Sequence, residues 1–133
     1  MVIDGATMMQ ILLIGLAGGL GTVARYLVGL WARDALGTTF PYGTLIVNVV
    51  GCFLIAIIAH GASMAVISPA QRLTMATGFM GGLTTYSSFN LETTQYFQSR
   101  AWYVGFLNVG VTMIACFVAG LLGFMAARRV WGS

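Results

Sequence analysis

One short segment of this 133-residue chain combines glycine, hydroxyl and aromatic residues in a pattern suited to ion chemistry. It runs from Gly81 to Phe89 (GGLTTYSSF) and interrupts an otherwise apolar stretch. A helix that crosses a bilayer satisfies its own backbone hydrogen bonds, so a break at membrane depth frees polar groups that need partners. Such breaks persist where they line a cavity or are buried in protein, and they often bind ions. The segment therefore predicts an ion pathway.

Aromatic and polar side chains follow directly after this break. Tyr86 and Phe89 are three residues apart, so both rings lie on one helix face, with Ser87 beside them. The edge of an aromatic ring carries partial positive charge and can assist a small anion. Glu92, one turn further along, is the carboxylate embedded in an apolar segment, and we expect it to face an aqueous mouth.

Two further polar stripes repeat every four residues, which places each stripe on a single helix face. The stripes are Thr44, Asn48 and Cys52, and Asn108, Thr112 and Cys116. An amide in hydrocarbon needs partners, so a helix-bridging role for Asn48 remains an alternative to a role in the pathway. The two cysteines are interpreted as small buried hydrophobic residues and not as a disulfide or metal pair.

The types of polar group indicate which ion such a pathway could carry. Hydroxyls, amides and ring edges donate or present positive charge, and no acid lies at the centre of the stripes. Cation pathways usually offer carboxylates or rings of carbonyls, so this lining suits an anion. Backbone carbonyls freed at the break suit the opposite task of holding a hard cation such as sodium.

The elements that must position these groups are membrane-spanning helices. The chain is 59% hydrophobic and 7% charged, against about 25% charged residues in soluble domains. Each apolar segment exceeds the roughly 20 residues that cross a bilayer. The sequence therefore predicts one all-α integral membrane domain over residues 1–133, with helices at 9–31, 42–64, 71–98 and 102–127. The first helix lacks a preceding basic residue and is expected to stay in the protein rather than act as a cleaved signal.

The arginines set no preferred orientation. There is no lysine, and the arginines divide evenly between the two ends: Arg72, Arg128 and Arg129 on the side of the termini, and Arg25, Arg33 and Arg100 on the other. Without a positive-inside bias, the chain could insert both ways and pair head to tail, although a single orientation stays open.

Two features of the first helix bear on its packing. Gly15 and Gly19 form a GxxxG pair, which predicts the close approach of another helix. Arg25 must pair, reach toward the interface or face water, so either snorkelling or a place in an aqueous vestibule would account for it.

Three motifs, in this order and spacing, resemble the Fluc (CrcB) fluoride channel family over nearly the full chain. They are GGLGTVARY (18–26), PYGTLIVNVVG (41–51) and GFMGGLTTYSSFNLE (78–92). The resemblance implies a dual-topology antiparallel homodimer in a bacterial inner membrane, with fluoride pores and a central structural sodium ion. It implies passive export of fluoride that has entered as HF, with no nucleic-acid partner.

The same matching assigns roles to individual residues. The family's paired pore phenylalanines fall on Tyr86 and Phe89, and its pore asparagine falls on Asn48. Main-chain carbonyls of Gly81 and Thr84 from both subunits would hold sodium. The resemblance also implies pore-lining roles in the polar stripe for Asn108 and Thr112, and vestibule positions for Arg25 and Glu92. Thr44 and Ser87 complete the predicted fluoride path.

One residue departs from the family pattern. Tyr86 stands where phenylalanine is usual, and its added hydroxyl could donate to fluoride, block the path or bond elsewhere. We therefore predict conduction at an altered rate.

Two other functions compete with the channel. A small multidrug exporter would need a proton-exchanging carboxylate inside the first helix, whereas Asp4 precedes it. A non-transporting membrane subunit would use the polar residues only to hold helices together. An enzyme is not expected, because one histidine, two separated cysteines and one embedded glutamate form no recognisable nucleophile–base set.

Overall fold

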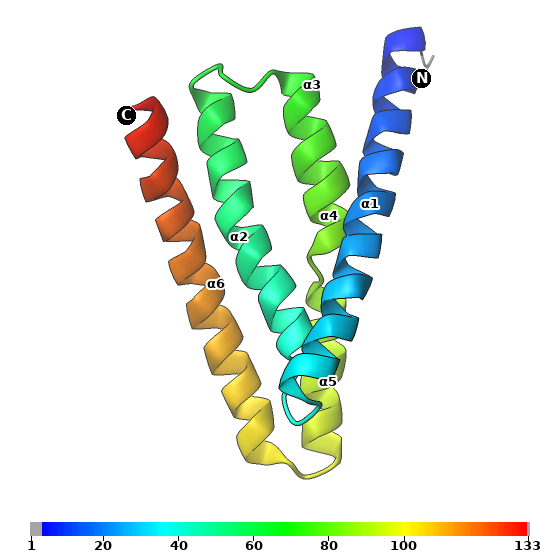
Figure 1. Ribbon diagram of the computed structural model, residues 1–133, viewed down its shortest axis with the longest axis vertical. Coiled ribbons are helices and arrows are strands. Elements are labelled where there is room, and N and C mark those ends of the chain that lie inside the picture. Colours follow the sequence, from blue (N-terminus) through cyan, green and yellow to red (C-terminus); the bar gives the residue numbers. More distant parts are fainter. Residues whose placement is uncertain (1–3, 133) are drawn as a thin grey trace.

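The computed structural model describes residues 4–132, and this part of the chain is helical and contains no strand. Four passes are built from α1 (Gly5–Leu36), α2 (Tyr42–Ser63), a divided third pass of α3 (Pro69–Arg72), η1 (Leu73–Met80), α4 (Gly81–Leu83) and α5 (Tyr86–Gln98), and α6 (Trp102–Trp131). Figure 1 shows both ends of the chain and the α2–α3 connection at one end of the bundle. The α1–α2 and α5–α6 connections lie at the other end. Residues 1–3 and 133 of the predicted domain lie outside the described range.

The long helices extend beyond their predicted limits because their ends are capped. The Asp4 carboxylate accepts a hydrogen bond from Thr7 N at 2.8 Å, so α1 begins at Gly5 instead of residue 9. At its other end Gly37 adopts φ 86° and donates to Arg33 O at 3.1 Å, which ends the helix. Among the described residues, α1, α2 and α6 are each long and apolar enough to cross a membrane.

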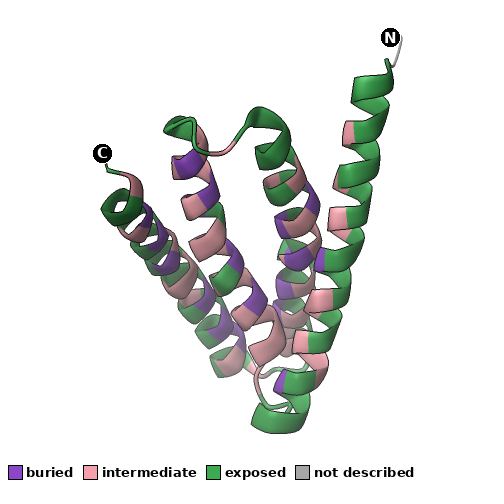
Figure 2. Ribbon diagram, turned by 45° about the horizontal axis from the view of Figure 1, so that its top comes forward, coloured by how far each residue is buried: buried purple, intermediate pink, exposed green. Residues whose placement is uncertain are grey.

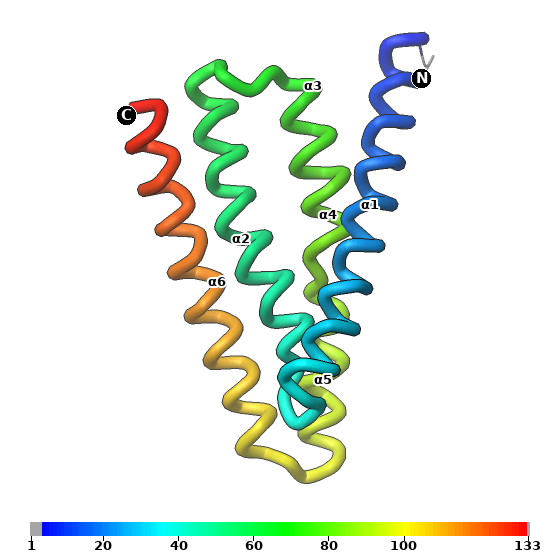
Figure 3. Tube along the Cα trace, viewed as in Figure 1, coloured from blue at the N-terminus to red at the C-terminus, as the bar shows by residue number. Residues whose placement is uncertain are grey.

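The third pass is broken where the sequence predicts. Ser68 opens it with a capping box to Gln71, and a π-helical stretch follows. The helix then stops, because Thr84 and Thr85 take extended backbone angles before α5 begins. Figure 3 shows this interruption as a short non-helical run near the middle of the bundle.

Glycines let α1 lie directly against the first half of the third pass. A Cβ at Gly21 would overlap the Phe79 carbonyl, and one at Gly82 would overlap the Gly18 carbonyl. The predicted pair is therefore wrong for contacts within this chain: Gly15 and Gly19 have open space where a Cβ would be. The 3.6-residue turn of α1 points the pair outward and presents Gly18 and Gly21 to the third pass.

The apolar surface of the chain is largely on the outside. α2 packs along α6, and buried residues line the inner faces of these helices and of the third pass (Figure 2). α1 is exposed over most of its length, and Leu16 and Leu20 are each at least 65% exposed. Large apolar side chains in contact with the surroundings are expected when lipid is the solvent. The chain is thus a multi-pass membrane protein.

Candidate functional site

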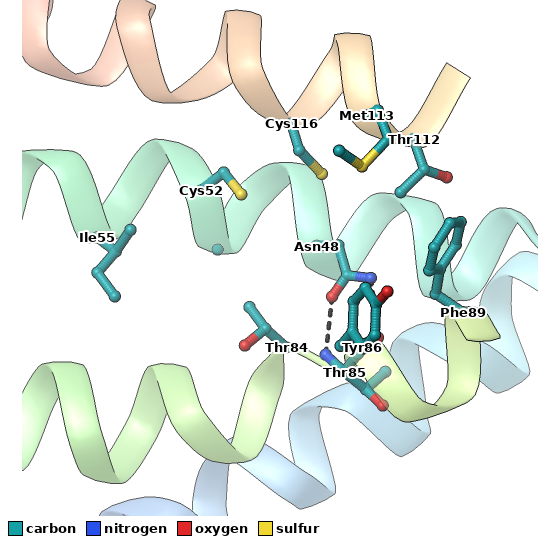
Figure 4. Close-up of a pocket in the computed structure, with 11 residues that line it drawn as sticks. Asn48, Cys52, Ile55, Thr84, Thr85, Tyr86, Phe89, Thr112, Met113 and Cys116 are labelled. Atoms are coloured by element: carbon teal, nitrogen blue, oxygen red, sulfur yellow. Dashed lines mark hydrogen bonds between the residues drawn. The ribbon is translucent and has the colours of Figure 1, made fainter. Parts of the chain in front are cut away.

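Asn48 of α2 makes a two-way hydrogen-bonded pair with the broken backbone. Thr85 N donates to Asn48 Oδ1 at 2.7 Å, and Asn48 Nδ2 donates to Thr85 O at 3.0 Å. In an unbroken helix the Thr85 N–H would instead bond to the Gly81 carbonyl, four residues earlier. Asn48 therefore replaces a helical partner and stabilises the extended conformation (Figure 4).

Hydroxyl groups finish the helix ends on either side of the break. Thr85 is the N-cap of α5: its Oγ1 accepts from Ser88 N at 3.1 Å and donates to Ser88 Oγ at 2.9 Å. On the other side, Thr84 Oγ1 donates to Met80 O at 2.9 Å. Because these groups satisfy local backbone, the break is a defined conformation.

Arg25 reaches the same break from α1. Its guanidinium donates to Thr84 O at 3.4 Å, a long hydrogen bond. The side chain therefore lies at the depth of the break, which differs from the predicted position near the end of its helix. A cation that points at a carbonyl inside the bundle adds positive potential beside the break.

The break opens onto a pocket of about 320 Å³. Asn48, Thr84 and Thr85 lie at one side of it, and α6 forms the other side (Figure 4). The complete lining is Asn48, Gly51, Cys52, Ile55, Thr84, Thr85, Tyr86, Phe89, Thr112, Met113 and Cys116. A few polar groups on an apolar wall are the usual composition of a site that orients a small ligand.

The two predicted pore aromatics share this pocket but differ in environment. Their ring centroids are 5.7 Å apart and the rings are tilted by 50°. Phe89 is 7% exposed, whereas Tyr86 is 75% exposed on the outer surface of the chain. Ser87 and Gly81 are also exposed, so part of the predicted path faces outward from a single chain.

Below Phe89, a line of hydrogen bonds connects α5 to α6. Asn108 Nδ2 donates to Thr93 Oγ1 at 2.9 Å, and Thr93 Oγ1 donates to Phe89 O at 2.7 Å. Thr112 Oγ1 donates to Asn108 Oδ1 at 3.3 Å. All three side chains are buried, and Asn108 is only 1% exposed. Asn108 therefore links helices, while Thr112 lies between this line and the pocket.

Thr44 and Glu92 meet nearer the end of the bundle. Thr44 Oγ1 donates to Glu92 Oε1 at 2.6 Å, and both side chains are half-buried. Within residues 4–132, Glu92 Oε2 is buried without a hydrogen-bond partner. The two residues line a second pocket, of about 290 Å³, with the α1–α2 connection. This pocket lies at the end of the bundle opposite the termini, so Glu92 is next to an opening to water.

Two residues of the site were missing from the predicted set. Thr85 is the direct partner of Asn48, and Thr93 joins Phe89 to Asn108. Thr93 is four residues after Phe89, so a hydroxyl bonded back along the helix was a readable signal. The pairing of Thr85 with Asn48 depends on how two distant helices meet, and no local signal reports it.

The fold and the pocket define a class: a small multi-pass membrane protein with a polar, hydrogen-bonded break between its helices. Residues 12–124 match the family described as CrcB-like protein, Camphor Resistance (CrcB). The chain belongs to this family.

Curated relatives cover most of the chain. The protein named fluoride-specific ion channel FluC in Sorangium cellulosum is 47% identical over 118 residues, which is 88% of this chain and 93% of that protein. The protein of that name in a Geobacter species is 40% identical over 124 residues, 92% of this chain and 100% of the relative. A third, from Rhizobium etli, is 42% identical over 119 residues, 86% of this chain and 94% of its own length.

Proposed function

We propose that this protein is a channel that lets fluoride leave a bacterial cell passively across the inner membrane. The observation that carries the proposal is the break in the third pass, which Asn48 and Thr85 hold open beside a pocket. The names of the curated relatives support the choice of fluoride. No energy source is required, because the ion moves down its own gradient. Fluoride that entered as neutral HF and dissociated in the cytoplasm would drain through the pore.

The chemistry of the pocket suits a small, strongly hydrated anion. Fluoride must exchange its water for other hydrogen bonds, and groups that donate are available on both sides of the pocket. Asn48 supplies an amide and Thr112 a hydroxyl, while the edges of Phe89 and Tyr86 offer partial positive charge. Arg25 adds a positive charge behind the break. Ser87 and Asn108 extend this polar lining along α5 and α6.

A second copy of the chain would complete the path. Tyr86, Ser87 and Gly81 are exposed next to irregular backbone, and such backbone is tolerated at membrane depth only when protein or a water-filled cavity covers it. The exposed Gly15 and Gly19 offer a surface that another helix can approach closely. The even distribution of arginines favours an antiparallel pair, because neither orientation is preferred. Two copies would give a homodimer with two equivalent pockets.

A sodium ion is part of this proposal, held by carbonyls at the dimer centre. The Thr85 N–H is donated to Asn48, so the Gly81 carbonyl is released from its helical partner. Gly81 is exposed, and the Thr84 carbonyl has a second lone pair beyond its long bond to Arg25. Hard carbonyl oxygens are the ligands that sodium prefers, so these two residues fit the ion. Sodium would join the breaks of the two subunits.

Fluoride efflux from liposomes tests the proposed function. Purified protein is reconstituted into vesicles loaded with potassium fluoride, valinomycin carries the balancing potassium current, and an electrode records released fluoride. Vesicles loaded with potassium chloride and read with a chloride electrode are the matched control. We expect rapid fluoride release and retention of chloride. Equal release of both anions would contradict fluoride selectivity, and release equal to that of protein-free vesicles would contradict a channel.

A further inference from the structure

Three sulfur side chains from two helices meet in the pocket beside Asn48. Cys52 of α2 and Cys116 and Met113 of α6 all line this pocket. The same three residues also line the adjoining apolar pocket, of about 530 Å³. Figure 4 shows the two thiols and the thioether together between α2 and α6. The cysteines were interpreted from sequence as unrelated buried hydrophobic residues, but the fold brings them together.

The geometry of the two thiols allows them to act on one ligand. Both are free and half-buried, and they are close enough to interact directly with each other. α2 and α6 approach closely at this level, since a Cβ on Gly120 would lie 3.8 Å from the Cys52 carbonyl. Met113 is 61% exposed, so its flexible thioether can move toward the thiols.

We propose that Cys52, Cys116 and Met113 form a binding site for a soft monovalent cation of the Cu⁺ or Ag⁺ type. Thiolate and thioether sulfur select soft ions, and such ions accept two or three ligands. Among residues 4–132, no three His, Cys, Asp or Glu side chains cluster, so the ligand set of a structural zinc site is missing. Each coordinating thiol releases one proton to water when its sulfur binds the ion.

Occupancy of this site would close the pathway beside it. The sulfur site and the Asn48–Thr85 pair line one pocket, so a bound cation and its ligands would fill space on the proposed fluoride route. Fluoride is a hard anion and does not extract a soft cation from sulfur. The inference therefore adds a regulatory metal site to the proposed function.

Silver binding to the purified full-length protein tests the site without reference to transport. Protein in chloride-free detergent buffer is equilibrated with silver nitrate, freed of excess metal on a desalting column, and analysed for silver per chain. We expect one silver ion per chain, and at least tenfold weaker binding in Cys52→Ser and in Cys116→Ser. Met113→Leu should weaken binding by a smaller factor. Met125→Leu, which changes a lipid-facing thioether of α6, is the matched control and should bind as the native chain does.

Efflux supplies a second readout, in which each variant is compared with its own silver-free rate. Micromolar silver should slow fluoride release from native vesicles at least tenfold, excess dithiothreitol should restore it, and both cysteine variants should resist. Native stoichiometric binding in both cysteine variants would overturn the site. Binding without slowed efflux would overturn the closing role alone. Failure of all vesicles to release fluoride would contradict the proposed function, while the binding result would still decide the site.

Discussion

The two halves of the third pass are held in place by different forces. The first half, η1 and α4, lies against α1 through glycine backbone, and Gly78 and Gly82 leave no room for side chains. The second half, α5, is joined to α6 by the buried hydrogen bonds of Thr93 and Asn108. The first half fixes the position of the break, and the second presents polar groups next to it. Close packing and polar function are therefore separated within one segment.

The largest expected effect comes from filling the glycine contact in the first half. In Gly82→Ala the new methyl group would overlap the Gly18 carbonyl and lie 3.0 Å from Thr22 N, so backbone must move. We expect destabilisation at or above the roughly 3 kcal/mol upper range for overpacked sites. Thermal unfolding in detergent measures the change.

Gly19→Ala is the matched control for this variant. It adds the same methyl group one residue away from Gly18, at a position with nothing within 4 Å. Its melting temperature should stay near the native value or rise, because alanine favours helix. Equal losses in the two variants would contradict packing of α1 on α4 through glycine.

A smaller effect is expected from the hydrogen-bonded half. Asn108→Ala removes the donor to Thr93 and the acceptor for Thr112, leaving two buried hydroxyls with one bond fewer. We expect a loss of about 1–3 kcal/mol, the usual range for an unsatisfied buried group. Asn90→Ala, on the exposed face of α5, should cost far less in the same denaturation experiment. Similar costs would show that Asn108 contributes no more than a surface amide.

The smallest effect on stability is expected at Tyr86. Its ring is 75% exposed in the single chain, and removal of the hydroxyl in Tyr86→Phe leaves the contact with Phe89 intact. The melting temperature should change by the equivalent of less than about 0.5 kcal/mol. The initial rate of fluoride efflux should nevertheless differ from the native rate, because the hydroxyl lies at the edge of the pocket. Identical rates would exclude a role of this hydroxyl in conduction.

The sequence is sufficient to predict the arrangement of helices but not how their faces meet. Hydropathy locates the four passes, and glycine followed by hydroxyl residues locates the break at Thr84 and Thr85. Helix ends are placed too far inward, because the Asp4 cap and the arginine-rich end of α6 lie outside the apolar core. The outward direction of Gly15 and Gly19 depends on the rotation of α1 about its axis, which contacts with the third pass decide.

The candidate site shows the same division. Asn48 is recognisable because an amide in an apolar helix requires partners, yet its partner Thr85 is 37 residues away. The meeting of Cys52 with Cys116 likewise arises only when α2 packs on α6. Local patterns identify which groups need contacts, whereas the packing of distant helices decides which contacts they receive.

The initial rate of fluoride efflux through Asn48→Asp tests most directly the claim that the Asn48–Thr85 pair forms the fluoride path. The carboxylate can still accept from Thr85 N, so the break keeps one of its two bonds, and elution as a single native-like species confirms folding. The donor to Thr85 O is lost and a negative charge faces the pocket, which repels an anion. We predict at least tenfold slower efflux than through the native protein. An unchanged rate in the folded variant would contradict the account.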